Sequence, residues 1–270
     1  RQRQMCIRDR NNSMINRKMI GRVLGMLLFI ELGMFLLCAG VSAGYGESDY
    51  KYFLYTCIIN AVVGGLLLLY GRGAENKMSR RDGYCVVTLS WVFFTFFGML
   101  PFYFSGSIDT ITNAFFETMS GFTTTGATIL DDIESLSHGM LFWRSLTQWI
   151  GGLGIVFFTI AILPIFTTGG VQLFSAESTG VTHDRTHPKI NVMAKWLWTI
   201  YLVLTVSETV LLMFGGMSLF DAICQSFATT ATGGYSTKQN SISYWNSPYI
   251  EYVVAIFMIV SSINFSLFLM

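Results

Sequence analysis

GFTTTGAT (residues 121–128) places four threonines and two glycines in the middle of a strongly apolar chain. The chain has 270 residues, of which 52% are hydrophobic and 12% are charged, about half the charged fraction of soluble domains. This composition predicts an integral membrane protein in a lipid bilayer, and the net charge of +1 argues against a general nucleic-acid binder. Non-helical backbone at membrane depth is tolerated only where it is buried in protein or lines a water-filled cavity. The membrane fold around GFTTTGAT must therefore bury this stretch in protein or place it beside a water-filled cavity.

Apolar runs on both sides of this stretch are long enough to span a bilayer, which takes about 20 residues as a helix. The sequence predicts six spans, the last of which is still running where the sequence stops: residues 20–41, 52–70, 84–104, 140–166, 193–214 and 249–270. Residues 110–121 and 218–229 are apolar but too short to span, so we expect re-entrant helices there. The predicted fold class is therefore all-α, with units of helix, re-entrant pore loop and helix.

Both ends of the sequence depart from this pattern. The first ten residues, RQRQMCIRDR, carry four arginines without periodicity, and we expect residues 1–13 to be a non-native or disordered tail. At the other end, SSINFSLFLM has no basic stop and no polar tail, so we expect the native protein to continue beyond it.

Basic residues are concentrated in two loops. Residues 71–83 and 167–195 contain several lysines and arginines, whereas residues 105–142 contain none. The positive-inside rule puts the two basic loops and the N-terminus in the cytoplasm. Both short helices are therefore expected to enter and leave from the outer face.

The two short helices and the polar loops after them form an internal repeat. Shifted by 108 residues, TITNAFFETMSGFTTTGAT overlies SLFDAICQSFATTATGGYS, with the identities Ala114/Ala222, Thr124/Thr232 and Gly126/Gly234. A shift of 107 would pair Gly126 with Gly233, so the register of the second loop stays open by one residue. Thr110 and Ser218 are predicted N-caps at matching positions. The repeat predicts an architecture built from one unit.

The position of the loops favours a cation. Each loop follows the C-terminal end of a short helix, which carries about half a negative charge. Glycine lets such a loop turn successive carbonyls to one side, and carbonyls with threonine hydroxyls can replace the hydration shell of a monovalent cation. No acidic residue lies inside either loop, which disfavours a divalent ion. The two polar loops together are predicted to form an ion filter. If the sequence held only one such loop, an ordinary polar surface loop would be the better interpretation.

Several polar residues near the loops are candidates for filter support. Glu117 and Gln225 occupy matching places in the short helices, where each would hydrogen-bond the filter backbone, pair with Arg144 or simply face an aqueous vestibule. Arg144 either snorkels to the interface or lies near the pore mouth. Thr123 begins the first loop, and Asn264 would hydrogen-bond between helices or face the cavity.

Two further features lie within predicted spans. WIGGLG (149–154) is interpreted as a helix-packing patch, since small residues let backbones approach closely. Glu31 and Glu208 are charges at membrane depth, where they are costly and usually functional. The sequence offers no basic partner for either carboxylate.

Four motifs, FETMSGFTTTGAT, RSLTQWIGGLGI, SFATTATGGYST and SSINF, resemble the TrkH-type subunit of the Trk/Ktr/HKT potassium transporter superfamily. The resemblance implies four helix–pore loop–helix repeats around one pore, preceded by two additional helices. Residues 14–83 would hold these two helices and a cytoplasmic loop, residues 84–192 the first repeat, and residues 193–270 a second repeat that is truncated in its last helix.

The resemblance also implies the chemistry. The ion-lining positions would be Thr124, Thr125 and Gly126 in the first loop and Thr232, Gly233 and Gly234 in the second. A glycine in each loop implies a preference for potassium over sodium. The implied protein is no enzyme and holds no prosthetic group or other metal; it takes up potassium across the bacterial inner membrane. Its implied partners are a second copy, in a homodimer, and a cytosolic nucleotide-binding (TrkA/RCK-type) regulatory subunit.

Three other classes of function compete with this interpretation. A secondary cation transporter of another family with broken helices would carry inverted repeats, whereas the two units here are offset by an even number of crossings and are parallel. A membrane enzyme would need to gather His138, His183, His187, Asp131 or Asp132, which are predicted in loops on opposite sides of the membrane. No feature of the sequence requires a non-transporting scaffold.

Overall fold

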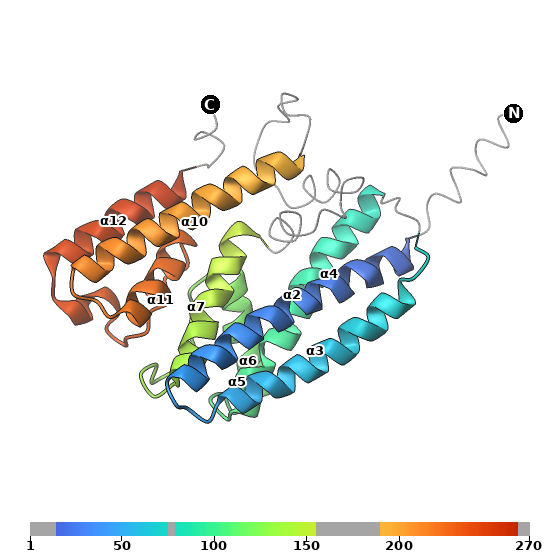
Figure 1. The fold of residues 1–270 in the computed structure, drawn as a ribbon, viewed down its shortest axis with the longest axis horizontal. Coiled ribbons are helices and arrows are strands. Elements are labelled where there is room, and N and C mark those ends of the chain that lie inside the picture. Colours follow the sequence, from blue (N-terminus) through green and yellow to red (C-terminus); the bar gives the residue numbers. More distant parts are fainter. Residues whose placement is uncertain (1–14, 75–78, 155–189, 264–270) are drawn as a thin grey trace, which may run out of the picture.

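A computed structural model of the protein describes residues 15–74, 79–154 and 190–263, and every regular element in these ranges is a helix (Figure 1). The α-helices are α2 (Arg17–Gly44), α3 (Tyr50–Tyr70), α4 (Arg80–Gly98), α5 (Leu100–Phe104), α6 (Ile111–Phe122), α7 (His138–Leu153), α10 (Ile190–Phe214), α11 (Leu219–Thr230) and α12 (Pro248–Ser262), and η2 (Ser241–Trp245) is a 3-10 helix. The predicted all-α fold class is confirmed.

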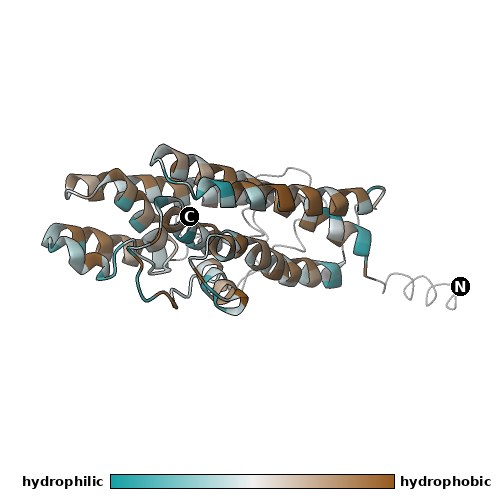
Figure 2. Cartoon of the chain, turned by 90° about the horizontal axis from the view of Figure 1, so that it is seen from below, coloured by the Kyte–Doolittle hydropathy of each residue, from teal (hydrophilic) through white to brown (hydrophobic). Residues whose placement is uncertain are grey.

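Four helical segments in the described ranges are long and apolar enough to cross a membrane: Arg17–Gly44, Tyr50–Tyr70, Arg81–Phe104 and Trp196–Phe214. Figure 2 shows hydrophobic residues along most of the length of the long helices. Large apolar side chains such as Leu37, Phe214 and Tyr252 are exposed. A soluble protein rarely exposes apolar surface on this scale, whereas lipid accommodates it. The chain is a multi-pass membrane protein.

Helix α7 lies between the group α10–α12 and the group α2–α4 (Figure 1), and it contacts α2, α6 and α11. Trp143 on α7 is fully buried, donates its indole N–H to the carbonyl oxygen of Gly98 at 2.9 Å, and packs against Phe35 with ring centroids 4.6 Å apart. Trp149, on the same helix, donates to Thr205 Oγ1 at 3.0 Å. Buried indole N–H groups need such partners, so the two tryptophans join α7 to both groups.

Two glycines let α7 pack closely against the ends of the short helices. A Cβ on Gly151 would overlap the carbonyl group of Phe122, the last residue of α6. A Cβ on Gly152 would lie 2.8 Å from the Cα of Ala231, which caps α11. Only residues without a side chain permit these approaches, so the interpretation of WIGGLG as a packing patch is confirmed.

Two predicted spans end earlier than expected. Helix α7 stops at Leu153, because Gly154 takes φ +76°, a region that favours glycine and cannot continue a helix. The prediction of one helix over 140–166 is therefore wrong, and its part from residue 155 onward lies outside the described ranges. Helix α12 stops at Ser262, since Ile263 is extended with ψ 138°; the rest of the predicted span lies outside the described ranges.

The third predicted span, 84–104, begins earlier and is interrupted. Ser79 and Asp82 form a capping box in which each side chain accepts the other's backbone N–H, so α4 starts at Arg80. Near the other end, Pro101 has no N–H to continue the helical ladder. The span is therefore divided into α4 and α5.

The two short helices begin as predicted. Thr110 Oγ1 accepts the backbone N–H of Asn113 at 3.2 Å, and Ser218 Oγ accepts that of Asp221 at 3.1 Å. These are N-cap hydrogen bonds, and both helices have 12 residues. The polar loops that follow them are called loop 1 (residues 123–128) and loop 2 (residues 231–236).

Glu47, in the connection between α2 and α3, caps helix α7. One carboxylate oxygen accepts the backbone N–H of His138 at 2.9 Å and lies 2.7 Å from its ring Nδ1. The other accepts the N–H of Gly139 at 3.4 Å, and Tyr45 stacks on the His138 ring with centroids 3.9 Å apart. Partial burial acts to raise the pKa of Glu47, but the hydrogen bonds from His138 and Gly139 outweigh it and hold the pKa below its ordinary range.

We expect Glu47→Gln to lower the thermal midpoint of the protein at neutral pH, because caps contribute about 0.5–2 kcal/mol. A carboxyl group whose pKa is lowered in the folded state stabilises fully above its ordinary pKa of about 4.3, and this contribution is lost as the pH falls through the folded-state value. Thermal unfolding in detergent at pH 7 and at pH 3 measures both effects. The advantage of wild-type protein over Glu47→Gln should be smaller at pH 3 than at pH 7.

The matched control is Asp131→Asn, which changes an exposed acid and should leave the midpoint unchanged. A constant difference between wild type and Glu47→Gln at both pH values would contradict the capping role of the carboxylate.

Candidate ion-binding site

Loop 1 and loop 2 follow the same backbone path. Thr124 has φ +52° and Thr232 has φ +54°, while Gly126 has φ +74° and Gly234 has φ +86°. These matched pairs are 108 residues apart, and Gly233 has no left-handed φ. The register with a shift of 108 is therefore the one that the backbone follows.

The hydrogen bonds at the start of the loops are also repeated. In each copy, two backbone N–H groups just after the short helix return to carbonyls of its last turn, which is the Schellman pattern. The bonds are Thr124 to Gly121 at 3.0 Å and Thr125 to Ser120 at 2.9 Å in loop 1, and Thr232 to Thr229 at 2.9 Å and Gly233 to Ala228 at 2.8 Å in loop 2.

A threonine occupies the left-handed position of both Schellman motifs, where glycine is usual. The left-handed region costs a residue with a Cβ about 1–2 kcal/mol, and a β-branched residue there is an outlier. Such conformations persist only where the surroundings hold them in place, and they cluster at functional sites. Thr124 and Thr232 therefore mark the two loops as a candidate site.

The two loops are in direct contact. A Cβ on Gly126 would overlap the carbonyl oxygen of Gly233, so the backbones meet at these two glycines. Tyr235 Oη of loop 2 also lies 3.3 Å from the carbonyl oxygen of Ala127 in loop 1. Segments more than 100 residues apart in sequence thus form one polar surface.

Hydroxyl groups are available on this surface. Thr123, Thr125, Thr128 and Thr232 are exposed. Thr123 Oγ1 donates to the carbonyl oxygen of Met119 at 2.8 Å and lies 2.8 Å from Thr125 Oγ1. Hydroxyls and backbone carbonyls are the oxygen donors that monovalent cations accept in selectivity filters.

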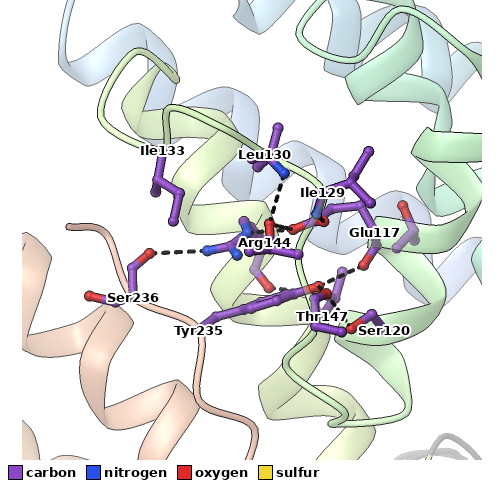
Figure 3. Close-up of polar contacts among 12 residues, drawn as sticks. Glu117, Ser120, Ile129, Leu130, Ile133, Arg144, Thr147, Tyr235 and Ser236 are labelled. Atoms are coloured by element: carbon purple, nitrogen blue, oxygen red, sulfur yellow. Dashed lines mark hydrogen bonds and ion pairs between the residues drawn. The ribbon is translucent and has the colours of Figure 1, made fainter. Parts of the chain in front are cut away.

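Glu117, on α6, holds loop 1 from behind (Figure 3). Its side chain is fully buried and accepts three hydrogen bonds: from Arg144 Nε at 2.8 Å, from Thr128 Oγ1 at 3.0 Å and from the backbone N–H of Ile129 at 3.0 Å. A buried charge is tolerated when it is paired and hydrogen-bonded in this way.

Arg144 connects this carboxylate to loop 2. Besides the bond to Glu117, its Nη1 donates to the carbonyl oxygen of Ser236 at 3.0 Å, and its guanidinium lies 3.6 Å from the centroid of the Tyr235 ring (Figure 3). Tyr235 Oη in turn donates to the carbonyl oxygen of Glu117 at 2.8 Å. The planar guanidinium serves a carboxylate, a carbonyl and an aromatic face at once, which a lysine could not do.

The candidate support residues have different outcomes. Glu117 both pairs with Arg144 and hydrogen-bonds the backbone after loop 1, so facing a vestibule is the wrong alternative for it. The snorkelling alternative for Arg144 is also wrong, because its side chain is 3% exposed. Gln225 differs from Glu117: its Nε2 donates to Thr229 within α11 at 3.3 Å, and among the residues that the structure describes it makes no bond to Arg144 or to loop 2. Asn264 lies outside the described ranges.

Two residues of the site are absent from the sequence-based candidates. Tyr235 directly follows the glycines of loop 2, and its backbone N–H donates to Gln148 Oε1 at 3.1 Å. Gln148 lies one helical turn after Arg144 on the same helix, and this i, i+4 spacing was the available signal, since it puts both side chains on one face of α7.

The two intramembrane glutamates are each hydrogen-bonded by a neutral neighbour. Asn60 Nδ2 donates to Glu31 Oε2 at 3.1 Å, and Thr230 Oγ1 donates to Glu208 Oε2 at 3.4 Å. Both glutamates are fully buried, and within the described ranges the second oxygen of each has no hydrogen-bond partner.

We expect Arg144→Met to destabilise the protein by about 3–5 kcal/mol, because it leaves the Glu117 carboxylate buried without its partner. The double variant with Glu117→Gln should be less destabilised than the sum of the two single changes, since it removes both members of the pair. Thermal unfolding in detergent measures the cycle. As a control, Glu134→Gln breaks the partly exposed pair with Lys238 (3.7 Å) and should have an effect below about 1 kcal/mol. Strict additivity of the Glu117 and Arg144 changes would contradict their coupling.

Comparison with known proteins places this arrangement in a family. Residues 50–270 match the model of the TrkH family, described as "Cation transport protein". The Trk system potassium uptake protein TrkH of Escherichia coli K12 is 42% identical over 250 residues, which cover 92% of this chain and 52% of that protein. The Trk system potassium uptake protein TrkG of the same strain is 32% identical over 252 residues, covering 93% and 52%.

A solved structure gives the same result. The crystal structure of the potassium transporter TrkH from Vibrio parahaemolyticus matches with a TM-score of 0.79 and 34% identity, covering 94% of this chain and 51% of that one. The chain thus spans about half the length of the relatives that it matches. The helices, the repeated loops and these matches agree, and the chain belongs to the TrkH family of cation transport proteins.

Proposed function

We propose that the protein takes up potassium through a filter to which loop 1 and loop 2 contribute backbone carbonyls and threonine hydroxyls. The proposed ion-lining positions are Thr124, Thr125, Gly126, Thr232, Gly233 and Gly234. Helices α6 and α11 are re-entrant in this proposal, and they enter from the outer face. Their negative C-terminal ends then lie next to the ion.

The observation that carries the proposal is the repeated strained backbone. Two loops with a left-handed threonine, a positive-φ glycine and the same Schellman bonds meet at Gly126 and Gly233. Schellman motifs are common at helix ends, but a β-branched threonine at the left-handed position is unusual, and both loops have one beside the same buried ion pair. The relatives named as potassium uptake proteins support potassium as the ion.

The family also supports proposals about the whole protein. We propose that residues 14–83 form two N-terminal helices and a cytoplasmic loop, that residues 84–192 form a first repeat, and that residues 193–270 belong to a second. We further propose a bacterial inner-membrane location, a homodimer and a cytosolic nucleotide-binding regulatory subunit. A transporter that coordinates its ion in this way needs no enzymatic activity and no prosthetic group.

Growth of a potassium-uptake-deficient bacterial strain at low potassium tests the function directly. The complete gene should rescue growth, and Gly234→Ser should lower the preference for potassium over sodium in uptake assays. A Cβ at Gly234 meets no atom within 4 Å, so this variant should fold. The substitution should destabilise the protein by about 1–2 kcal/mol, because a residue with a Cβ is strained at the φ of +86° that Gly234 adopts.

Gly106→Ser is the matched control. Gly106 also has a positive φ of +73° and open space around it, but it belongs to the loop between α5 and α6 and not to loop 1 or loop 2. It should keep the wild-type ion preference. Failure of the complete gene to rescue growth, or equal ion preferences for Gly234→Ser and the control, would refute the filter.

A further inference from the structure

Gln148 lies behind both polar loops. Its side chain is fully buried, and its Oε1 accepts the backbone N–H of Tyr235 at 3.1 Å. This bond identifies the oxygen end of the amide, so the other end is the N–H2 donor. The donor nitrogen lies 3.8 Å from the position that a Cβ of Gly126 would take. The amide therefore borders loop 1 and holds loop 2.

A Cβ on Gly233 would collide with the side-chain amide of Gln148. A Cβ on Gly233 would lie 2.5 Å from Gln148 Oε1 and 2.6 Å from Nε2, closer than non-bonded atoms can approach. The φ of Gly233 lies outside the left-handed range, so its φ does not require glycine. A Cβ at this position would force the Gln148 amide to move, which the burial of Gln148 and its bond to Tyr235 oppose.

The other two glycines of the loops have different reasons. Gly234 has a left-handed φ and open space, so only its backbone conformation requires glycine. Gly126 has a left-handed φ and also faces the carbonyl oxygen of Gly233, so a Cβ there would meet backbone. Of the three glycines, Gly233 alone is opposed by a side chain, and a second mutation can remove that side chain.

We propose that Gln148 is a positioning residue that sets the distance between the two filter loops and thereby the ion preference. Its amide fills the space next to Gly233, and its bond to Tyr235 fixes loop 2 at the point where loop 2 meets Gly126. The role in ion preference rests on the filter function proposed above. A shift of loop 2 moves the Gly233 carbonyl oxygen, which is one of the proposed ion ligands.

The contact is tested by a double-mutant cycle in the full-length protein. Gly233→Ala should lower the thermal midpoint and reduce potassium uptake, because the new methyl group collides with the amide. Adding Gln148→Ala should restore much of the thermal midpoint and of the potassium uptake. The methyl group at position 233 then occupies the space that the Gln148 amide leaves. Gly126→Ala is the control: Gln148→Ala should not rescue it, because its obstacle is the Gly233 carbonyl group. Equal damage by Gly233→Ala with and without Gln148 would overturn the contact.

The positioning role is tested by the ratio of potassium to sodium uptake, which a merely structural residue would not change. Gln148→Ala should lower this ratio about tenfold, which corresponds to about 1.4 kcal/mol, comparable to one hydrogen bond. A wild-type ratio in Gln148→Ala, with intact uptake, overturns the role of Gln148 and leaves the filter proposal standing. Absence of potassium uptake by the wild-type protein overturns the filter proposal, while the thermal cycle still decides whether the amide and Gly233 share one space.

Discussion

The buried ion pair between Glu117 and Arg144 is the interaction on which the rest of this site depends. Backbone and side-chain polar groups that are shielded from water need partners within the protein, and this pair supplies bonds to both loops. The carboxylate accepts a hydrogen bond from Thr128 Oγ1 in loop 1, and the guanidinium donates to the carbonyl of Ser236 in loop 2. The pair thus joins two repeats that are more than 100 residues apart in sequence, and helix α7 carries the arginine to the place where they meet.

Helix α7 contacts both loops, and its first turn, its middle and its last turn each make a different kind of contact. Glu47 caps its first turn, Arg144 and Gln148 project from its middle toward the loops, and Gly151 and Gly152 let its last turn approach the short helices. The strain stored at Thr124 and Thr232 is held by these contacts together with the Schellman bonds. These contacts hold the oxygen atoms of the proposed filter in place, and oxygen ligands of this kind replace the hydration shell of the ion.

Much of this architecture could be predicted from the sequence, and the failures have physical causes. Length and apolarity predicted the helices, and capping residues predicted the starts of α6 and α11. Helix ends were missed where one residue decides them, as at Gly154, since hydropathy does not report backbone angles. The partner of Arg144 could be named only as an alternative, because pairing over 27 residues depends on how α6 and α7 pack. The spacing of Gln148 from Arg144 placed both on one face of α7, but their common contact with Tyr235 depends on how loop 2 meets loop 1.

Rubidium is heavy enough to be seen by anomalous scattering, and it substitutes for potassium in oxygen-lined filters. The most direct test of the central claim is therefore the position of bound rubidium in crystals of the full-length protein. The account predicts an anomalous peak next to the exposed faces of loop 1 and loop 2, within coordinating distance of oxygens of Thr124 to Gly126 and Thr232 to Gly234. Rubidium bound elsewhere along the pore, with none beside these two loops, would contradict it.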